Sequence, residues 1–226
     1  MGRPFIQINC ASSFDGKIAS PDGARLHISG PWDVKRVHQL RAEIGTILVG
    51  AGTIIADDPK LRVKAEVIEK APPITKVVFD GAGRIPIGSR FLRTPGRSII
   101  ITSNLCNREW IMGIREAAIR EDLDLKIIEI EAGSRRFEVS SALAALFDEG
   151  IQRILVEGGS EVIWEFVSTG HFDLITIYFA PILVGGKGPS IMGGSGFTGF
   201  PDSVIVKSLT MTPDGGVLVE LIGKDQ

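Results

Sequence analysis

Short runs of apolar and β-branched residues recur along the chain, separated by Gly, Pro, Asp and Ser. Most of these runs are nearly continuous rather than alternating, which is typical of strands buried on both faces of a sheet. They predict strands at residues 5–10, 46–50, 75–80, 98–102, 125–130, 153–158 and 174–180.

Between these runs, apolar residues recur at helical spacing. Val34, Val37, Leu40 and Ile44 predict a helix that begins at Pro31, since proline suits the first turn of a helix. Alternating strands and helices indicate an α/β fold with a mostly parallel sheet flanked by helices. The other predicted helices span residues 108–120, 139–149 and 160–168.

The C-terminal part follows a different pattern. A glycine-rich connection at 182–201 is followed by two apolar segments, 203–212 and 216–223, which flank the sequence PDGG. Asp214-Gly215 between such segments is a strong β-hairpin signal. We therefore expect one domain over residues 1–226, whose sheet ends in an antiparallel hairpin.

Composition narrows the function classes. The formal net charge is −2, from 25 basic and 27 acidic residues, which is no electrostatic footprint for nucleic acid or an anionic membrane. Neither cysteine belongs to a Cys-x-x-Cys pair, and the three histidines show no metal-ligand spacing, so we expect no metal and two free buried thiols. With no signal peptide and no membrane-spanning run, the expected location is the cytoplasm.

Known phosphate and nucleotide motifs are absent or out of context. The residues 194–199 match G-x-G-x-x-G, but a dinucleotide fingerprint needs a strand before it and a helix after it. Here Pro201 and a predicted strand follow, so we attribute the match to a glycine-rich loop. There is no Walker A motif, no G-x-S-x-G elbow and no zinc deaminase signature.

Three segments remain as candidates for chemistry. In NCASSFDGKIAS (9–20), Asn9 and Lys17 either face a polar ligand such as a sugar or belong to a surface hairpin. In the segment 38–64, Gly50-Ala51-Gly52-Thr53 permits close backbone approach, and a helix starting at Thr53 would favour a phosphate. The basic residues that could converge there are Arg41, Arg62 and Lys64.

The third segment is RILVEGGSEV, in which a buried strand ends at Glu157 and runs into two glycines. One reading is a helix-capping turn with Ser160 at the N-cap. The other is a pyrophosphate turn through Gly158, Gly159 and the helix start, with Glu157 facing the adjoining cleft. The segment alone favours neither reading.

Taken in order, NCASSFDGKIAS, LRAEIGTILVGAGTIIADDPKLRVK, KVVFDGAGRIP, RILVEGGSEV and APILVGGKGPSIM resemble the reductase of the riboflavin pathway. This dihydrofolate-reductase-like family includes the C-terminal domain of the bacterial bifunctional deaminase–reductase and the stand-alone archaeal and fungal enzymes. The resemblance covers essentially the whole chain, which lacks a deaminase module. It implies reduction of 2,5-diamino-6-(ribosylamino)pyrimidin-4(3H)-one 5′-phosphate, with NADPH as the hydride donor, no metal and a homodimer.

The resemblance also implies roles for residues. The implied cofactor contacts are Thr53, Asp57, Asp80, Gly81, Ala82, Gly83, Ile128, Gly158, Gly159 and Ser160, with Arg84 expected at the 2′-phosphate. The implied substrate contacts are Asn9, Lys17, Arg41, Leu61, Lys64 and Glu157. Glu157 and Asp57 are the expected electrostatic catalysts, and Lys17 is expected to assist ring opening by proton transfer.

The chain departs from the family at several positions. Lys64 and Gly81 stand where many relatives have Arg and Ser, and Arg25 and His27 stand where bacterial relatives have Ser and Trp. Three alternatives stay open: the same chemistry on the deaminated pyrimidine, a reductase of another heterocycle, and a non-catalytic module that binds NADPH.

Overall fold

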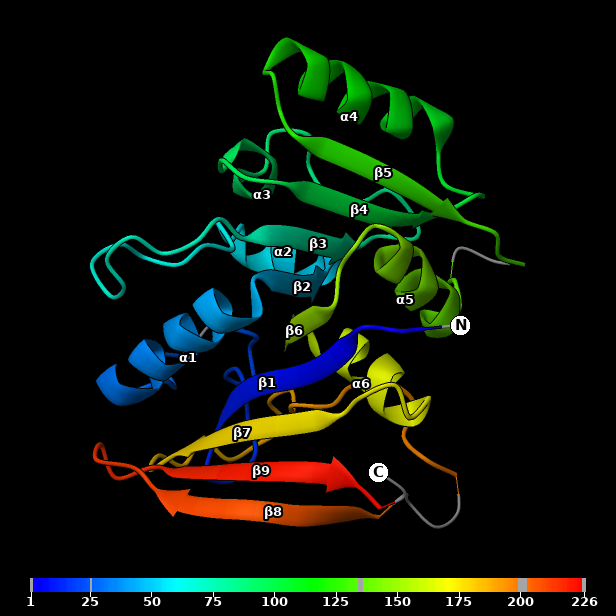
Figure 1. The fold of residues 1–226 in the computed structure, drawn as a ribbon. Coiled ribbons are helices and arrows are strands. Elements are labelled where there is room, and N and C mark those ends of the chain that lie inside the picture. The colour runs from blue at the N-terminus through cyan, green and yellow to red at the C-terminus, as the bar shows by residue number, and fades with distance from the viewer. Residues whose placement is uncertain (1, 25, 134–135, 199–202, 225–226) are drawn as a thin grey trace. The chain divides into compact units, whose positions relative to one another are not determined.

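The computed structural model describes residues 2–24, 26–133, 136–198 and 203–224, and within them the chain forms nine strands and six helices (Figure 1). The chain divides into two compact units. Unit 1 comprises Met1–Pro4 and Arg41–Ile154, and unit 2 comprises Phe5–Leu40 and Leu155–Gln226. The chain passes between the units after Pro4, within helix α1 (Pro31–Ile44) and within strand β6 (Arg153–Gly158).

Unit 1 contains four parallel strands in the order β5-β4-β3-β2. Every residue of β2 and β4 is buried, as the continuous apolar runs predict. The strands are β2 (Thr46–Gly50), β3 (Thr75–Phe79), β4 (Ser98–Ser103) and β5 (Leu125–Ile130). The helices are α2 (Ala51–Asp57), α3 (Arg90–Arg93), α4 (Arg108–Arg120) and α5 (Val139–Asp148).

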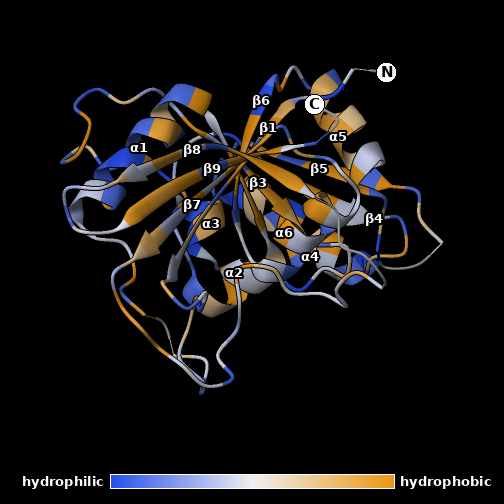
Figure 2. Cartoon of the chain, turned by 90° about the horizontal axis from the view of Figure 1, so that it is seen from below, coloured by the Kyte–Doolittle hydropathy of each residue, from blue (hydrophilic) through white to orange (hydrophobic). Residues whose placement is uncertain are grey.

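Unit 2 contains the strand order β6-β1-β7-β9-β8. Strands β1 and β7 are parallel, whereas β7, β9 and β8 are antiparallel neighbours. In Figure 2 the strands β7, β8 and β9 are coloured mostly as hydrophobic. The elements are β1 (Phe5–Ser13), α6 (Ser160–Ser168), β7 (Leu174–Ala180), β8 (Val204–Met211) and β9 (Val217–Gly223).

These elements confirm the predicted α/β class, with mostly parallel strands and a C-terminal antiparallel hairpin. The hairpin turn is the predicted one: Gly215 has a φ of 83°, and the Thr212 amide donates to the Gly216 carbonyl at 2.9 Å. Both thiols are free and buried, as predicted. Two helices differ: α2 begins at Ala51 rather than Thr53, and α3 was not predicted because four residues carry no periodic signal.

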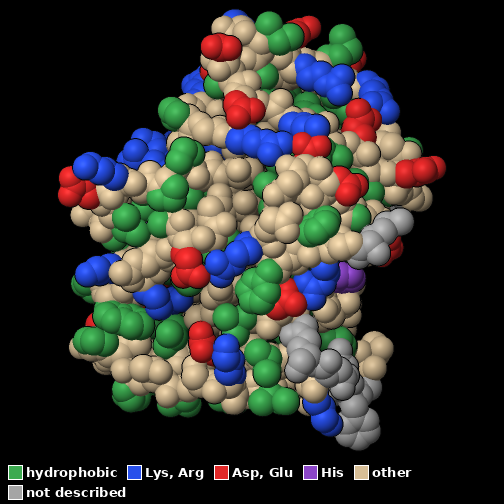
Figure 3. Space-filling view, in the orientation of Figure 1, with side chains coloured by type: hydrophobic (Ala, Val, Ile, Leu, Met, Phe, Trp, Pro, Cys, Tyr) green, Lys and Arg blue, Asp and Glu red, His purple; other side chains and the backbone are tan. Residues whose placement is uncertain are grey.

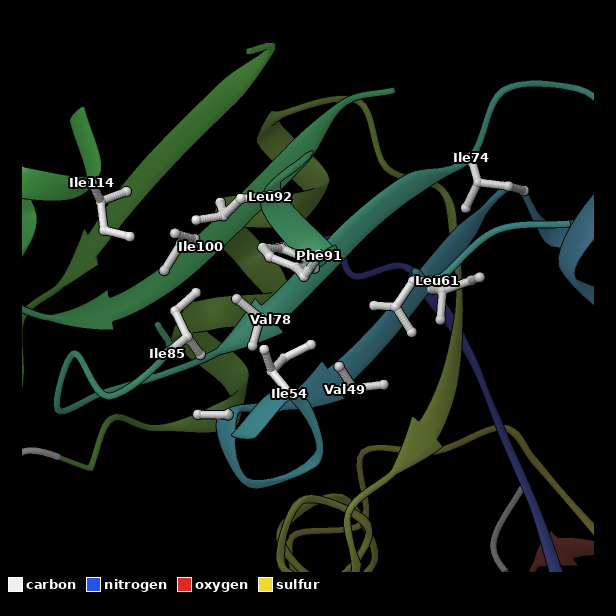
Figure 4. Packing of buried hydrophobic residues seen from close by; sticks show 12 residues of the cluster. Val49, Ile54, Leu61, Ile74, Val78, Ile85, Phe91, Leu92, Ile100 and Ile114 are labelled. Atoms are coloured by element: carbon white, nitrogen blue, oxygen red, sulfur yellow. The ribbon is translucent and has the colours of Figure 1, made fainter. Parts of the chain in front are cut away.

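The core of unit 1 is a cluster of aliphatic side chains around Phe91, which is fully buried (Figure 4). Ile54 of α2, Leu61 of the following segment and Val78 of β3 contribute to the same cluster. Helix α3 supplies both Phe91 and Leu92, so this short helix belongs to the core.

No helix in the described part of the chain is long and apolar enough to cross a membrane.

A buried lysine lies beneath α3. The Lys76 side chain is 1% exposed, and its Nζ donates to the Phe91 carbonyl at 2.8 Å and to the Thr94 carbonyl. The Nζ also lies 5.5 Å from the centroid of the Phe91 ring. Burial lowers the pKa of Lys76 from 10.5 to about 8, and the nearby Asp124 carboxylate opposes this shift.

The lowered pKa predicts a pH-dependent contribution to stability. Between pH 8 and 10.5 the unfolded chain holds a proton on Lys76 that the folded chain has released, so the free energy of unfolding rises with pH. The rise is at most about 1.4 kcal/mol per pH unit. In Lys76→Met this increment disappears, so the stability difference from wild type widens over that range. Urea unfolding at several pH values measures it.

An exposed lysine supplies the control. Lys35→Met on α1 removes an exposed amine instead of a buried one and is measured alongside. Parallel stability curves for wild type and Lys76→Met would show that Lys76 does not titrate as described.

Candidate active site

In unit 1, the candidate residues gather where parallel strands end. Gly50, the last residue of β2, pairs with Phe79, the last residue of β3. Helix α2 with Thr53 follows the first strand directly, and the segment Asp80–Arg84 follows the second. Ligands of open α/β sheets bind beyond the carboxyl ends of the strands, and both segments occupy that edge.

Ile128 belongs to the same edge by register. Phe79 pairs with Ile101 of β4, and Ile101 pairs with Ile128 of β5. Ile128 lies two residues before the end of β5 and is partly buried. The register therefore brings Thr53, the Asp80–Arg84 segment and Ile128 to the carboxyl side of unit 1.

Asp80 shapes a tight turn rather than facing solvent. It is fully buried, and its Oδ2 accepts from the amides of Arg84 at 2.6 Å and Ile85 at 2.8 Å. Gly83 has a φ of 70°, and a Cβ there would lie 2.6 Å from Cys106 Sγ. The turn therefore leaves the backbone of Gly81 and Ala82 partly exposed, whereas the carboxylate points inward.

Two polar groups at this turn could form further hydrogen bonds or ion pairs. Asp80 Oδ1 is buried and has no hydrogen-bond partner among the described residues. The Arg84 guanidinium lies 3.8 Å from that oxygen and is 60% exposed. At this distance and exposure the pair is weak, so Arg84 is available to an anionic group at the turn.

The last residue of α2 and the segment after it hold three further candidates. Asp57 and Lys64 are exposed, whereas the Leu61 side chain is 4% exposed and lies in the unit 1 core. Leu61 can therefore offer its backbone, but not its side chain, to a ligand. Arg41 Nη1 donates to the Arg62 carbonyl at 3.0 Å, which brings its guanidinium beside this segment.

In unit 2, Asn9 is held by a charged network that the sequence did not reveal. The Asn9 side-chain oxygen accepts from Arg36 Nη2 at 2.8 Å, and the same guanidinium donates to Asp33 Oδ1 at 2.6 and 2.8 Å. Asp33 is fully buried and also accepts from Ser29. The i, i+3 pair Asp33/Arg36 is visible in the sequence, but such pairs usually lie on a solvated helix face.

Lys17 lies in a tight, anchored turn. Its amide donates to Ser13 Oγ at 2.9 Å, and its carbonyl accepts from the Ser13 amide at 2.8 Å. Asp15 accepts from Ser13 Oγ and from the amides of Val184 and Gly185. These hydrogen bonds lower the pKa of Asp15 to about 2, and the one from Ser13 contributes most. The carboxylate therefore stays charged and links the two loops.

The segment Glu157–Ser160 ends β6 and begins α6. Gly158 has a φ of 136°, and Gly159 occupies the N-cap without a side-chain hydrogen bond. The reading that placed Ser160 at the N-cap is wrong, because Ser160 is the first helical residue. Its carbonyl accepts from the Gly193 amide at 3.1 Å, so the glycine-rich connection lies against the helix start. Glu157 is partly buried.

Two expectations lie partly outside the described residues. Arg25 and Gly199 are not described, whereas His27 is exposed. Among the residues that are described, no group of three His, Cys, Asp or Glu side chains could hold a metal ion. The roles implied for individual site residues stay predictions.

The chain matches the RibD C-terminal domain over residues 4–217. It is similar to the 2,5-diamino-6-ribosylamino-4(3H)-pyrimidinone 5′-phosphate reductase of Archaeoglobus fulgidus, with 35% identity over 204 residues, 86% of this chain and 89% of the relative. The protein of the same name from Methanothermobacter thermautotrophicus is 33% identical over 219 residues, 94% of this chain and 95% of the relative.

A solved structure agrees with these matches. The diaminohydroxyphosphoribosylaminopyrimidine deaminase/5-amino-6-(5-phosphoribosylamino)uracil reductase of Thermotoga maritima matches with a TM-score of 0.73 and 26% identity. The match covers 98% of this chain and 57% of that one, which confirms the dihydrofolate-reductase-like fold class. Because the family match spans nearly the whole sequence, the chain belongs to the RibD C-terminal domain family.

Proposed function

We propose that the chain reduces the ribosyl group of 2,5-diamino-6-(ribosylamino)pyrimidin-4(3H)-one 5′-phosphate to a ribityl group, with NADPH as reductant, in riboflavin biosynthesis. The observation that carries the proposal is the near full-length match to two archaeal reductases named for this substrate. The family match spans 4–217 and so includes parts of both units, which supports one reductase domain over residues 1–226.

The residues of unit 1 fit a dinucleotide. The first turn of α2 contains Gly52, where an added Cβ would meet nothing within 4 Å, and Thr53. Beside it, the Asp80–Arg84 turn offers backbone and one exposed guanidinium. An arginine is a common partner for the 2′-phosphate that distinguishes NADPH from NADH, and we assign Arg84 that role. In unit 2 we assign pyrophosphate contacts to the backbone of Gly158–Ser160.

The chemistry needs few protein groups. NADPH supplies a hydride for C1′ of the ring-opened imine when it is bound. Glu157 stabilises the positive charge of the imine nitrogen, with Asp57 as the second candidate carboxylate. Asn9, oriented by Arg36, holds a ribose hydroxyl, and Lys17 moves a proton during ring opening. Arg41 and Lys64 bind the 5′-phosphate.

The function test follows NADPH absorbance with each pyrimidine in turn. We expect oxidation with the 2,5-diamino compound. A preference for the deaminated 5-amino-6-(ribosylamino)uracil 5′-phosphate would assign the bacterial substrate, which the Thermotoga maritima protein's name contains. NADPH binding without oxidation by either compound would contradict a catalytic role.

Glu157→Gln removes the carboxylate and keeps the size of the side chain. We expect single-turnover hydride transfer to slow on the order of 10²-fold, since a preorganised charge at the reacting centre is lost. Substrate affinity should change little. Glu161→Gln, four residues on in the first turn of α6, is the matched control and should react at the wild-type rate. An unchanged rate in Glu157→Gln would show that another group stabilises the cation.

Gly52→Ala separates stability from cofactor binding. Alanine favours a helix over glycine by up to about 1 kcal/mol, and the added methyl meets no protein atom, so thermal stability should rise. NADPH affinity, measured by titration calorimetry, should fall about tenfold, which corresponds to about 1.4 kcal/mol. Unchanged NADPH affinity would mean that the cofactor does not approach this backbone.

We further propose that the protein is cytoplasmic, since the proposed substrate and NADPH are intracellular metabolites, and that it forms a homodimer through strand β8. Strand β8, last in the strand order, exposes large apolar side chains on both faces, and hydrophobic residues line the corresponding lower border of Figure 3. Exposed apolar edge strands mark interaction sites. The exposed side chains are Val204, Ile205, Val206, Leu209 and Met211.

Leu209→Lys tests this surface, because a buried charge in the interface opposes association. We expect wild type to sediment as a dimer and the variant as a monomer at micromolar concentration. Ile119→Lys, at another exposed apolar side chain (82% exposed, on α4), should remain dimeric. A monomeric wild type, or a dimeric Leu209→Lys, would refute β8 as the interface.

A further inference from the structure

The segment from Asp57 to Lys64 contains two non-glycine residues in the left-handed region. Asp58 has φ 41° and ψ 56°, and Leu61 has φ 42°. Such conformations cost roughly 1–3 kcal/mol each and persist only where surrounding contacts impose them. The proposed function gives roles to two residues of this segment, Asp57 and Lys64, so the contacts that impose its conformation matter for binding.

One contact comes from the Asp58 side chain. Its Oδ1 accepts from the Arg90 amide at 2.6 Å, at the start of α3. The N-cap position of α3 belongs to Ser89, but that residue makes no side-chain cap bond. Ser89 Oγ is buried and has no hydrogen-bond partner in the described part of the chain. The Asp58 side chain therefore caps the first turn of α3, as Ser89 does not, although it lies 32 residues before Arg90 in the sequence.

The other end of α3 is held by Lys76. Its Nζ donates to the carbonyls of Phe91 and Thr94, which would otherwise lack partners at the helix end. A carboxylate thus binds the amide end of α3, and a buried amine binds its carbonyl end. Both side chains come from outside the helix.

Packing links α3 to the strained segment. Phe91 and Leu92 of α3 and Leu61 of the segment belong to one buried cluster, and Figure 4 shows Leu61 directed into it. At the other end of the segment, Arg41 donates to the Arg62 carbonyl. The segment is therefore fixed by its own buried leucine, by Asp58 and by Arg41.

We propose that Asp58 and Lys76 are positioning residues, which hold α3 as a brace that keeps the Asp57–Lys64 segment in its substrate-binding conformation. Neither side chain needs to touch substrate or cofactor for this role. The proposal rests on the proposed function for the identity of the substrate, but the structural part can be tested without turnover.

The first test compares Asp58→Gly with Asp58→Asn. Glycine removes the acceptor and tolerates the left-handed conformation, so backbone strain does not confuse the result. Asparagine keeps a side-chain oxygen for the Arg90 amide and also tolerates that conformation. We expect KM for the ribosylaminopyrimidine phosphate to rise about fivefold in Asp58→Gly, with kcat within about twofold, and to stay near wild type in Asp58→Asn.

The second test removes the donor instead. Arg90→Pro lacks the amide hydrogen, yet proline suits a first helical position, and Ser89 already has the extended ψ of 149° that a following proline requires. Arg90→Ala keeps the amide and is the matched control for the lost side chain. We expect Arg90→Pro to reproduce the KM of Asp58→Gly and Arg90→Ala to match wild type. If Asp58→Gly does not fold, the comparison of Arg90→Pro with Arg90→Ala tests the proposal by itself.

Hydrogen–deuterium exchange of the peptide covering residues 57–64 supplies the readout that is independent of activity. Exchange should be at least about fivefold faster in Asp58→Gly, Arg90→Pro and Lys76→Met, and unchanged in Asp58→Asn and Ser89→Ala. Lower melting temperature with unchanged exchange and KM would overturn the proposal and leave a merely structural cap. If wild type reduces neither pyrimidine, the proposed function is wrong. The exchange data would still show whether Asp58 and Lys76 hold the Asp57–Lys64 segment in place.

Discussion

The parallel register of β2, β3, β4 and β5 is the constraint on which the rest of unit 1 depends. Because Gly50, Phe79, Ile101 and Ile128 lie in one row across the sheet, the segments that follow these strands emerge at one edge. The glycine turn before Thr53 and the Asp80–Arg84 turn can then serve one ligand, although Asp80 lies 27 positions after Thr53 in the sequence. Strands β2 and β4 are buried at every residue, so apolar packing on both faces of the sheet holds them in place.

Strands and long helices could be predicted because their signals are local. Continuous apolar runs identified the buried strands, and the bounds of α1, α4 and α6 agree with the structure. Helix α3 was missed because contacts with distant residues, rather than its own four residues, stabilise it. Asp58 and Lys76, from distant parts of the chain, satisfy its ends, and Phe91 anchors it in the core. The start of α2 was misplaced by two residues, since Gly50 and Gly52 offered two turn positions.

For the candidate site, the sequence indicated the segments better than the directions of their side chains. Asp80 and Leu61 both lie in segments that the resemblance assigned to ligands, yet both side chains point into the protein. Their direction follows from tertiary contacts: the amides of Arg84 and Ile85 for the carboxylate, and the Phe91 cluster for the leucine. Arg36 was missed for the same reason, since only the fold brings it to Asn9.

The proposed function depends on direct hydride transfer from NADPH to C1′ of the opened ribose. It is tested most directly with NADPH carrying deuterium at C4, prepared separately in each stereochemical form, and mass analysis of the pyrimidine product. We expect one of the two forms to yield a ribitylamino product that is heavier by one deuterium, located on C1′. A product without deuterium from both forms, or a pyrimidine left unreduced, would contradict it.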